Sequence, residues 1–103
     1  MEELYRIHAE MCKVFSNPTR LVILDLLRDK EMSVTELIEK TGLTQSNISQ
    51  HLSIMKSKEI VTSNRRGQNI YYRLKNPKII KASDIIKEVL SERPRSRMQK
   101  VKQ

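Results

Sequence analysis

The side chains best suited to specific binding chemistry lie between residues 45 and 57. At about 100° per residue, as in an α-helix, the polar side chains of this stretch share one arc: Gln45, Ser46, Ser49, Gln50, Ser53, Lys56 and Ser57. Ile48, Leu52 and Met55 form a separate narrow stripe. The arc carries no carboxylate, whereas an ordinary solvated face mixes acids with bases. Amides can pair with adenine, and hydroxyls with bases or phosphates, so we interpret the arc as a surface that reads the major groove of DNA.

Two short helices joined by a tight turn would present this arc to a partner. Ser33 and Glu36 have the spacing of a capping box, which starts a helix. Gly42 offers the left-handed backbone that commonly follows a helix end, and Thr44 can cap the second helix. Residues 34–58 therefore predict a helix-turn-helix.

Hydrophobic periodicity predicts three further helices. Apolar residues recur at intervals of three and four over residues 2–15 and again over residues 77–91. Residues 18–28 are apolar almost all round, which is typical of a central buried helix. The first and last of these helices have more apolar surface than a small monomer can cover.

A β-hairpin is predicted after the helix-turn-helix. Residues 60–63 and 69–74 are rich in β-branched and aromatic side chains, which favour strands. Residues 64–68 would form the connecting loop, with Arg65 and Arg66 at its tip. The expected fold is mainly α with a small β-hairpin: a winged helix-turn-helix of about five helices and a two-stranded wing.

Length and charge limit the choice of partners. The chain has 103 residues and a formal net charge of +8. This length allows one domain, which we expect to span residues 1–91, followed by a basic, disordered tail at residues 92–103. A basic balance favours phosphate groups or anionic membranes as partners. We expect double-stranded DNA and no membrane role, because no apolar run approaches the roughly 20 residues that span a bilayer.

The location and the oligomeric state follow from similar arguments. The single cysteine, Cys12, excludes an internal disulfide framework and fits a reducing compartment. The acidic start does not resemble a secretion signal, so we expect a cytoplasmic protein. We expect a homodimer built around a two-fold axis from the first and last helices, with seven interface residues: Leu4, Ile7, Met11, Ile79, Ile85, Ile86 and Val89.

Three stretches in this order resemble the ArsR/SmtB family of small dimeric repressors. They are FSNPTRLVIL at residues 15–24, LTQSNISQHL at 43–52 and RRGQNIYYRL at 65–74. The resemblance covers about residues 4–90. The resemblance implies a dimer that binds an operator and dissociates from it when the protein binds a signal, often a metal ion.

The resemblance also implies which residues touch DNA. The family contacts bases from four positions that match Gln45, Ser46, Ser49 and Gln50. Its wing touches the DNA backbone or minor groove. We expect backbone or minor-groove contacts from six side chains: Thr44, Ser53, Lys56, Arg65, Arg66 and Gln68.

The metal sites of the family are missing from this sequence. Ser33 and Thr35 stand where one site has its cysteines, and neutral hydroxyls bind soft metals poorly. The last helix opens with Asn76-Pro77-Lys78 in place of Asp-x-His, and no histidine follows His51. We therefore expect no metal and no cofactor, and the sequence does not identify an effector.

Two residues on the first helix remain as candidate sensors. Cys12 and His8 lie four residues apart and could respond to oxidation or to a metal across a dimer axis. The alternative, which we favour, is a buried thiol and a partly buried imidazole in the interface. His51, at the edge of the apolar stripe, is interpreted as a helix-packing or phosphate contact.

The predicted function is a homodimeric, sequence-specific DNA-binding regulator that represses transcription from an inverted-repeat operator. The alternative is a nonspecific basic nucleic-acid-binding protein, chromatin-like or RNA-binding, whose binding would be sensitive to salt and nearly blind to sequence. An enzyme is not expected, because the sequence has no Gly-rich phosphate loop, no metal cluster and no recognisable nucleophile–base pair.

Overall fold

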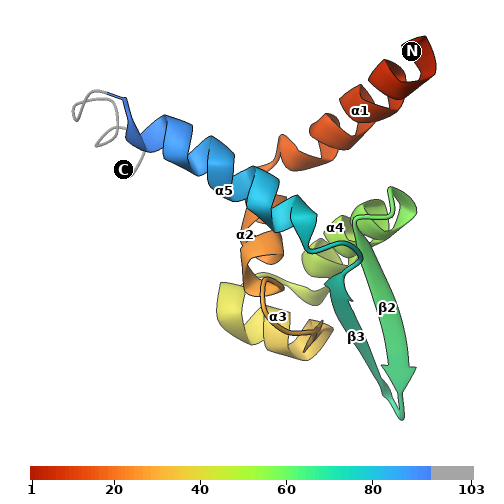
Figure 1. Cartoon of the computed structure of the whole chain (residues 1–103). Helices are drawn as coiled ribbons and strands as arrows, with labels where there is room; N and C mark the ends of the chain where they lie inside the picture. Colours follow the sequence, from red (N-terminus) through yellow and green to blue (C-terminus); the bar gives the residue numbers. More distant parts are fainter. Residues whose placement is uncertain (94–103) are drawn as a thin grey trace.

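The computed structural model describes residues 1–93, and the predicted basic tail lies outside this part from residue 94 onward. Five helices and three short strands follow one another along the chain: α1 (Glu2–Phe15), α2 (Pro18–Leu26), β1 (Met32–Ser33), α3 (Val34–Thr41), α4 (Gln45–Ser57), β2 (Val61–Arg66), β3 (Asn69–Leu74) and α5 (Lys78–Ser91). Figure 1 shows that α1 and α5 diverge from the body, while the β2–β3 hairpin projects away from them. The predicted winged helix-turn-helix is confirmed.

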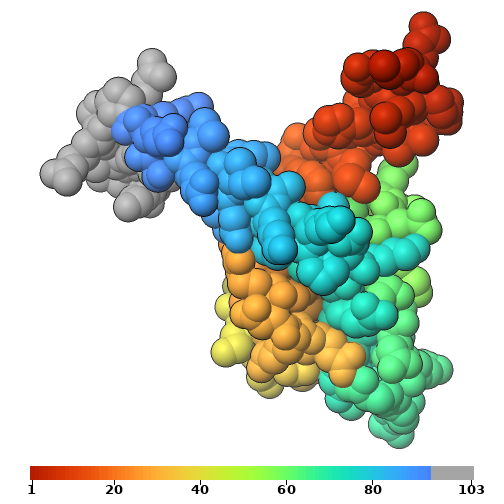
Figure 2. Space-filling view, in the orientation of Figure 1, coloured from red at the N-terminus to blue at the C-terminus, as the bar shows by residue number. Residues whose placement is uncertain are grey.

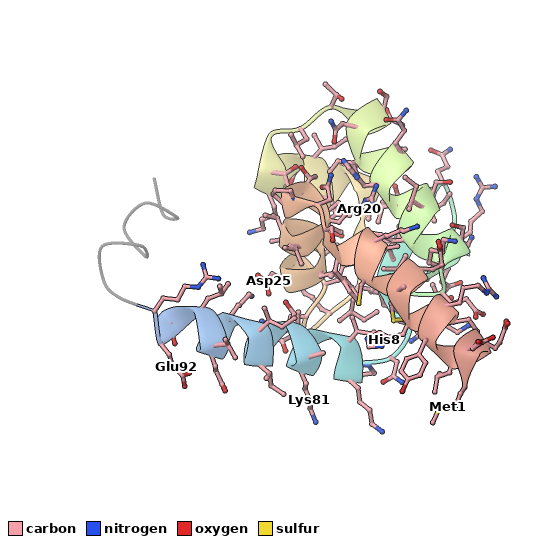
Figure 3. The ribbon with its side chains drawn as sticks, turned by 90° about the horizontal axis from the view of Figure 1, so that it is seen from above. Met1, His8, Arg20, Asp25, Lys81 and Glu92 are labelled. Carbon is pink, nitrogen blue, oxygen red and sulfur yellow. The ribbon has the colours of Figure 1, made fainter. Side chains whose placement is uncertain are left out.

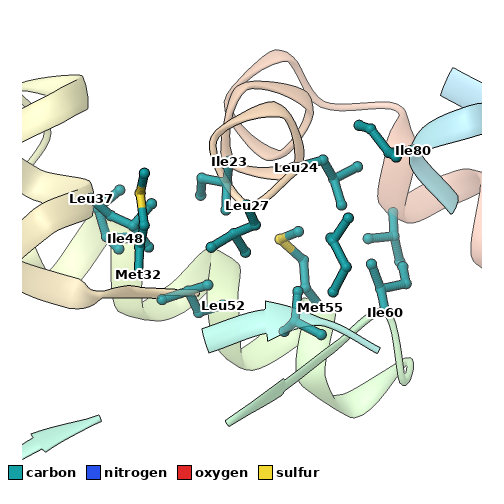
Figure 4. Close-up of a cluster of buried hydrophobic side chains, with 13 residues drawn as sticks. Ile23, Leu24, Leu27, Met32, Leu37, Ile48, Leu52, Met55, Ile60 and Ile80 are labelled. Carbon is teal, nitrogen blue, oxygen red and sulfur yellow. The ribbon is translucent and has the colours of Figure 1, made fainter. Parts of the chain in front are cut away.

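One hydrophobic core holds the helix-turn-helix, α2 and the base of the wing together (Figure 4). Ile48, Leu52 and Met55, the predicted stripe of α4, are completely buried there. They pack in a cluster with thirteen members: Val14, Ile23, Leu24, Leu27, Met32, Leu37, Ile48, Leu52, Met55, Ile60, Val61, Leu74 and Ile80. Burial of this stripe turns the opposite side of α4 to solvent.

The predicted helix boundaries of the motif are confirmed by their caps. The Ser33 hydroxyl accepts from the Glu36 backbone N–H, and the Glu36 carboxylate accepts from the Ser33 N–H, both at 3.1 Å. Gly42 ends α3 with φ +73°, a conformation that glycine adopts without strain. The Thr44 hydroxyl accepts from the Asn47 N–H at 3.2 Å. These local bonds fix where α3 ends and α4 begins.

The central buried helix predicted at residues 18–28 is present, with two differences. The helix ends at Leu26, and only one side of it reaches the core. Leu21 and Val22 remain 37% and 49% exposed. The reason is that α1 and α5 diverge instead of closing over α2, which leaves its outer side open in the single chain (Figure 1).

The wing differs from the prediction at its tip and at its base. β2 continues through Arg66, which pairs with Asn69, so the turn consists only of Gly67 and Gln68 and the two arginines belong to the strand. Gly67 has φ +64°, which permits this two-residue turn. A third strand, β1, pairs antiparallel with β3 and makes a sheet of order β1-β3-β2.

An ion-pair network joins α5 to α2. Arg28 donates to both carboxylate oxygens of Asp84, at 2.7 and 2.8 Å, and to Asp25 at 2.8 Å. Lys87 donates to both oxygens of Asp25, at 2.8 and 2.9 Å. Ile80 is the one buried side chain of α5, and this polar network adds to the packing of Ile79 and Ile80 in holding the helix on the body.

Acid will weaken this attachment. The hydrogen bond from Arg28 lowers the pKa of Asp84; for Asp25, burial raises the pKa, but the bonds from Lys87 and Arg28 outweigh it and lower it overall. A carboxylate whose pKa is lowered by folding stabilises the fold at pH values above its ordinary pKa, which is near 4. It loses that contribution as the pH falls through its lowered pKa in the folded state. The melting temperature of the wild type should therefore drop more between pH 5 and pH 2.5 than that of Asp84→Asn.

The matched control for this prediction is Asp29→Asn, which removes an exposed aspartate of the same region. Its melting curve, followed by circular dichroism, should keep the acid sensitivity of the wild type. Equal acid sensitivity in wild type and Asp84→Asn would show that the network does not stabilise the attachment of α5.

Candidate nucleic-acid interface

The polar arc of α4 is exposed in the structure. The side chains at positions 45, 46, 49, 50, 53, 56 and 57 are all exposed, while Ile48, Leu52 and Met55 on the other side are buried. The sequence of α4 contains no Asp or Glu. The arc is therefore accessible along the whole helix and carries amide, hydroxyl and ammonium groups, which can pair with base edges and phosphates in a DNA groove.

The C-terminal end of α4 is connected to the wing by a hydrogen bond. Lys56 Nζ donates to the Ser63 hydroxyl of β2 at 2.7 Å. At the other end, Gln45 and Gln68 line one hollow of about 210 Å³ with residues of α3 and β3. The structure thus brings the predicted residues of the helix and of the wing turn to one side of the molecule.

The two wing arginines point to opposite faces of the sheet. Alternate residues of a strand share a face, so Arg65 lies on the face of Ser63, which contacts α4 through Lys56. Arg66 lies on the other face. Its guanidinium stacks over the Tyr71 ring at 4.0 Å from the centroid and forms an ion pair with Glu31.

The contacts of Arg66 distinguish it from its neighbour. The hydrogen bond from Arg66 holds the pKa of Glu31 below its ordinary value, and the same bond raises the pKa of Arg66. Glu31 directly precedes β1, so the pair connects the wing to the segment between α2 and α3. Sequence analysis missed this pair because it depends on the strand register.

The residues proposed as sensors are exposed in the single chain. Cys12 and His8 both lie on the solvent-exposed side of α1 in the single chain, and their burial in a dimer interface stays a prediction. Within residues 1–93 no group of three or more His, Cys, Asp or Glu side chains is placed to hold a metal ion. Ser33, at one position where the family has a metal site, is buried and serves as the cap of α3.

The predicted dimer residues divide into two groups. Leu4, Ile7, Ile85, Ile86 and Val89 are 48–65% exposed. Met11 and Ile79 are partly buried against the core. The exposed members lie on the two diverging helices, and Figure 2 shows the open notch between them.

Further apolar residues extend this exposed surface. Tyr5 of α1 is 63% exposed, and Leu21 and Val22 of α2 are also exposed. Leu21 and Ile86 line a hollow of about 180 Å³, together with Phe15, Ile79 and Leu90. No helix within the described part of the chain is long and apolar enough to cross a membrane.

Comparison with known proteins agrees with the fold. Residues 17–63 match the family of bacterial regulatory proteins named after arsR. The chain is 36% identical over 86 residues to the nodulation protein NolR of Rhizobium meliloti, covering 84% of this chain and 70% of that protein. It is 42% identical over 72 residues to the transcriptional repressor PagR of Bacillus anthracis, covering 69% of this chain and 72% of that protein.

A solved structure has the same winged helix-turn-helix fold. The homodimeric winged helix-turn-helix DNA-binding domain of a possible ArsR-family regulator from Mycobacterium bovis superposes with a TM-score of 0.80 at 30% identity. The match covers 88% of this chain and 84% of that one. With the exposed arc, the wing beside it and these relatives, the chain belongs to the ArsR family of winged helix-turn-helix transcriptional regulators.

Proposed function

We propose that two copies of this chain form a homodimer that binds an inverted repeat in double-stranded DNA and represses transcription there. Residues 1–91 supply both DNA binding and dimerisation in this proposal, which places the protein in the cytoplasm with the DNA. The observation that carries it is the acid-free, exposed arc of α4 above a completely buried stripe.

The proposed DNA contacts divide between bases and backbone. Gln45, Ser46, Ser49 and Gln50 would meet base edges in the major groove, because amides and hydroxyls supply both donors and acceptors. Thr44, Ser53, Lys56 and Gln68 surround them and would contact the backbone. No metal enters the proposal.

Selection from a random pool of duplexes tests this function. The full-length protein should enrich an inverted repeat whose half-sites are about one helical turn apart, because a two-fold dimer places its recognition helices in successive major grooves. The nonspecific alternative predicts an unenriched pool and equal, steeply salt-dependent binding to every sequence. Enrichment of a single, unrepeated half-site would contradict the dimeric arrangement.

We assign the main phosphate contact of the wing to Arg65. Arg66 is already engaged by Glu31 and Tyr71, whereas Arg65 shares a face with the α4 side of the wing. Arg65→Ala should lower the slope of log Kobs against log salt by about 0.9 per chain. Arg66→Ala should change this slope less and should lower the melting temperature instead.

The two variants are matched, since each removes one arginine from adjacent positions of β2. The measurements are salt-dependent fluorescence anisotropy with the selected duplex and thermal unfolding of the free protein. A larger change of slope for Arg66→Ala than for Arg65→Ala would reverse the assignment.

A further inference from the structure

The guanidinium of one residue, Arg20, connects the three helices α1, α2 and α4. Arg20, near the start of α2, donates from Nε to His51 Nδ1 of α4 at 3.2 Å. It also donates to the carbonyl of Val14, in the last turn of α1, at 3.4 Å. Its own backbone N–H is held by the Asn17 side chain at 3.1 Å. Figure 3 shows Arg20 where α1, α2 and α4 meet.

The bond from Arg20 to His51 adds a directional polar contact to the apolar packing of α4. The buried stripe of α4 decides which side of the helix faces the core, and this apolar packing is non-directional. His51 lies at the edge of that stripe and directly follows Gln50, one of the proposed base-reading residues. A hydrogen bond to His51 therefore restrains the direction of the neighbouring arc.

The bond requires a neutral imidazole. Arginine can only donate, so His51 Nδ1 must carry a lone pair and the ring proton must be on Nε2. Protonation would place an N–H of the ring against the guanidinium and would bring two positive charges together. Burial, and secondly the charge of Arg20, lower the pKa of His51.

Within residues 1–93, the hydrogen-bond partner of His51 brings a positive charge and no negative charge to the ring. From α2 the group that faces it is Arg20, and the end of α1 contributes the uncharged carbonyl of Val14 to the same guanidinium. Among residues 1–93, Arg20 is the one ionisable group whose charge acts on the imidazole.

We propose that Arg20 is a positioning residue that sets the orientation of α4 through His51, and that protonation of His51 releases this link and weakens specific DNA binding. The inference rests on the proposed function. It makes the regulator sensitive to acid through a pair of residues 31 positions apart in the chain.

The predicted change of DNA affinity with falling pH is opposite in sign to the change expected from charge alone. Protonation of any histidine adds positive charge, and added positive charge alone strengthens binding to phosphates. Between pH 7.5 and pH 5.0 the affinity of the wild type for the duplex enriched from a random pool should instead fall about tenfold, as expected when one hydrogen bond from a charged donor is lost.

Three variants separate the link from general effects of pH. His51→Asn keeps an acceptor near the position of Nδ1 but does not titrate, so its affinity should be nearly constant from pH 7.5 to 5.0. His51→Phe keeps a ring without an acceptor and should bind as weakly at pH 7.5 as the wild type does at pH 5.0. His8→Asn removes the other histidine and should retain the pH profile of the wild type.

The link can also be observed without DNA. In ¹⁵N NMR of the imidazole at pH 7.5, His51 should be the tautomer protonated at Nε2. Arg20→Ala should alter the tautomer ratio and the titration of His51 while the protein stays folded, which circular dichroism would verify at each pH.

The outcomes distinguish a failure of the Arg20–His51 link from a failure of the proposed DNA-binding function. An enriched duplex with the same pH profile for wild type and His51→Asn would overturn the inference and leave the proposed function intact. A wild type that binds more tightly at pH 5.0 would also overturn it. If no duplex is enriched, the proposed function fails and the inference fails with it, whatever the NMR titration shows about the Arg20–His51 bond.

Discussion

Replacing Ile86 with glutamate should convert the protein to a monomer and lower its affinity for an inverted repeat by about a hundredfold or more. Ile86 is 61% exposed in the single chain, so the change should leave the fold intact. In the proposed dimer the new glutamate would place an unpaired carboxylate in the buried interface, which typically costs about 3–5 kcal/mol of association free energy. The loss in DNA binding follows because a dimer holds its second recognition helix at high effective concentration beside the DNA.

Lys81→Glu is the matched control for this variant. It places the same carboxylate on α5 at an exposed position, roughly 140° around the helix from Ile86 at 100° per residue. Sedimentation velocity should show a monomer for Ile86→Glu and a dimer for Lys81→Glu. A dimer with unchanged affinity in the Ile86→Glu protein would place the interface elsewhere.

Replacing Gln50 with alanine should weaken base preference without removing binding. A side-chain amide that pairs in two places with adenine contributes about 1–3 kcal/mol of discrimination per contact. Gln50 is exposed on the central turn of the arc and makes no other hydrogen bond through its side chain among residues 1–93. The ratio of affinities for selected and scrambled duplexes should therefore fall by about tenfold or more per half-site.

The affinity of Gln50→Ala for the scrambled duplex should stay within about twofold of the wild-type value, because nonspecific binding depends on phosphate contacts. Competition binding with duplexes changed at single positions would show where the preference is lost. A variant that keeps the complete base preference of the wild type would remove Gln50 from the reading surface.

Much of the fold was predictable because its determinants are local. The capping box of Ser33, the left-handed Gly42 and the periodicity of Ile48, Leu52 and Met55 all act within a few residues. The same periodicity identified the exposed arc. Local rules therefore sufficed to locate the helix-turn-helix and the side of α4 that faces solvent.

Other features depend on partners that are distant in sequence. The opposite orientations of Arg65 and Arg66 follow from the register of β2 with β3, which composition does not determine. The strand β1 is only two residues long and has no pattern of its own. The bond from Arg20 to His51 spans α2 and α4, and no single stretch of sequence reveals it.

The exposure of the apolar residues was only partly predictable. The prediction of a buried α2 counted apolar residues without knowing how α1 and α5 are arranged around it, and Leu21 and Val22 proved to be exposed. The exposed Cys12 is a similar case. Both belong to surfaces whose burial depends on a second copy of the chain in the proposed dimer.

In the proposed dimer, α4 of each chain reads a specific DNA sequence. The most direct measurement is fluorescence anisotropy of the full-length protein with the selected inverted repeat and with a scrambled duplex, across a series of salt concentrations. We predict saturation at two chains per site and a preference of about a thousandfold or more for the selected duplex. Equal affinities for both duplexes, falling together as salt is raised, would contradict the claim and favour a nonspecific nucleic-acid-binding protein.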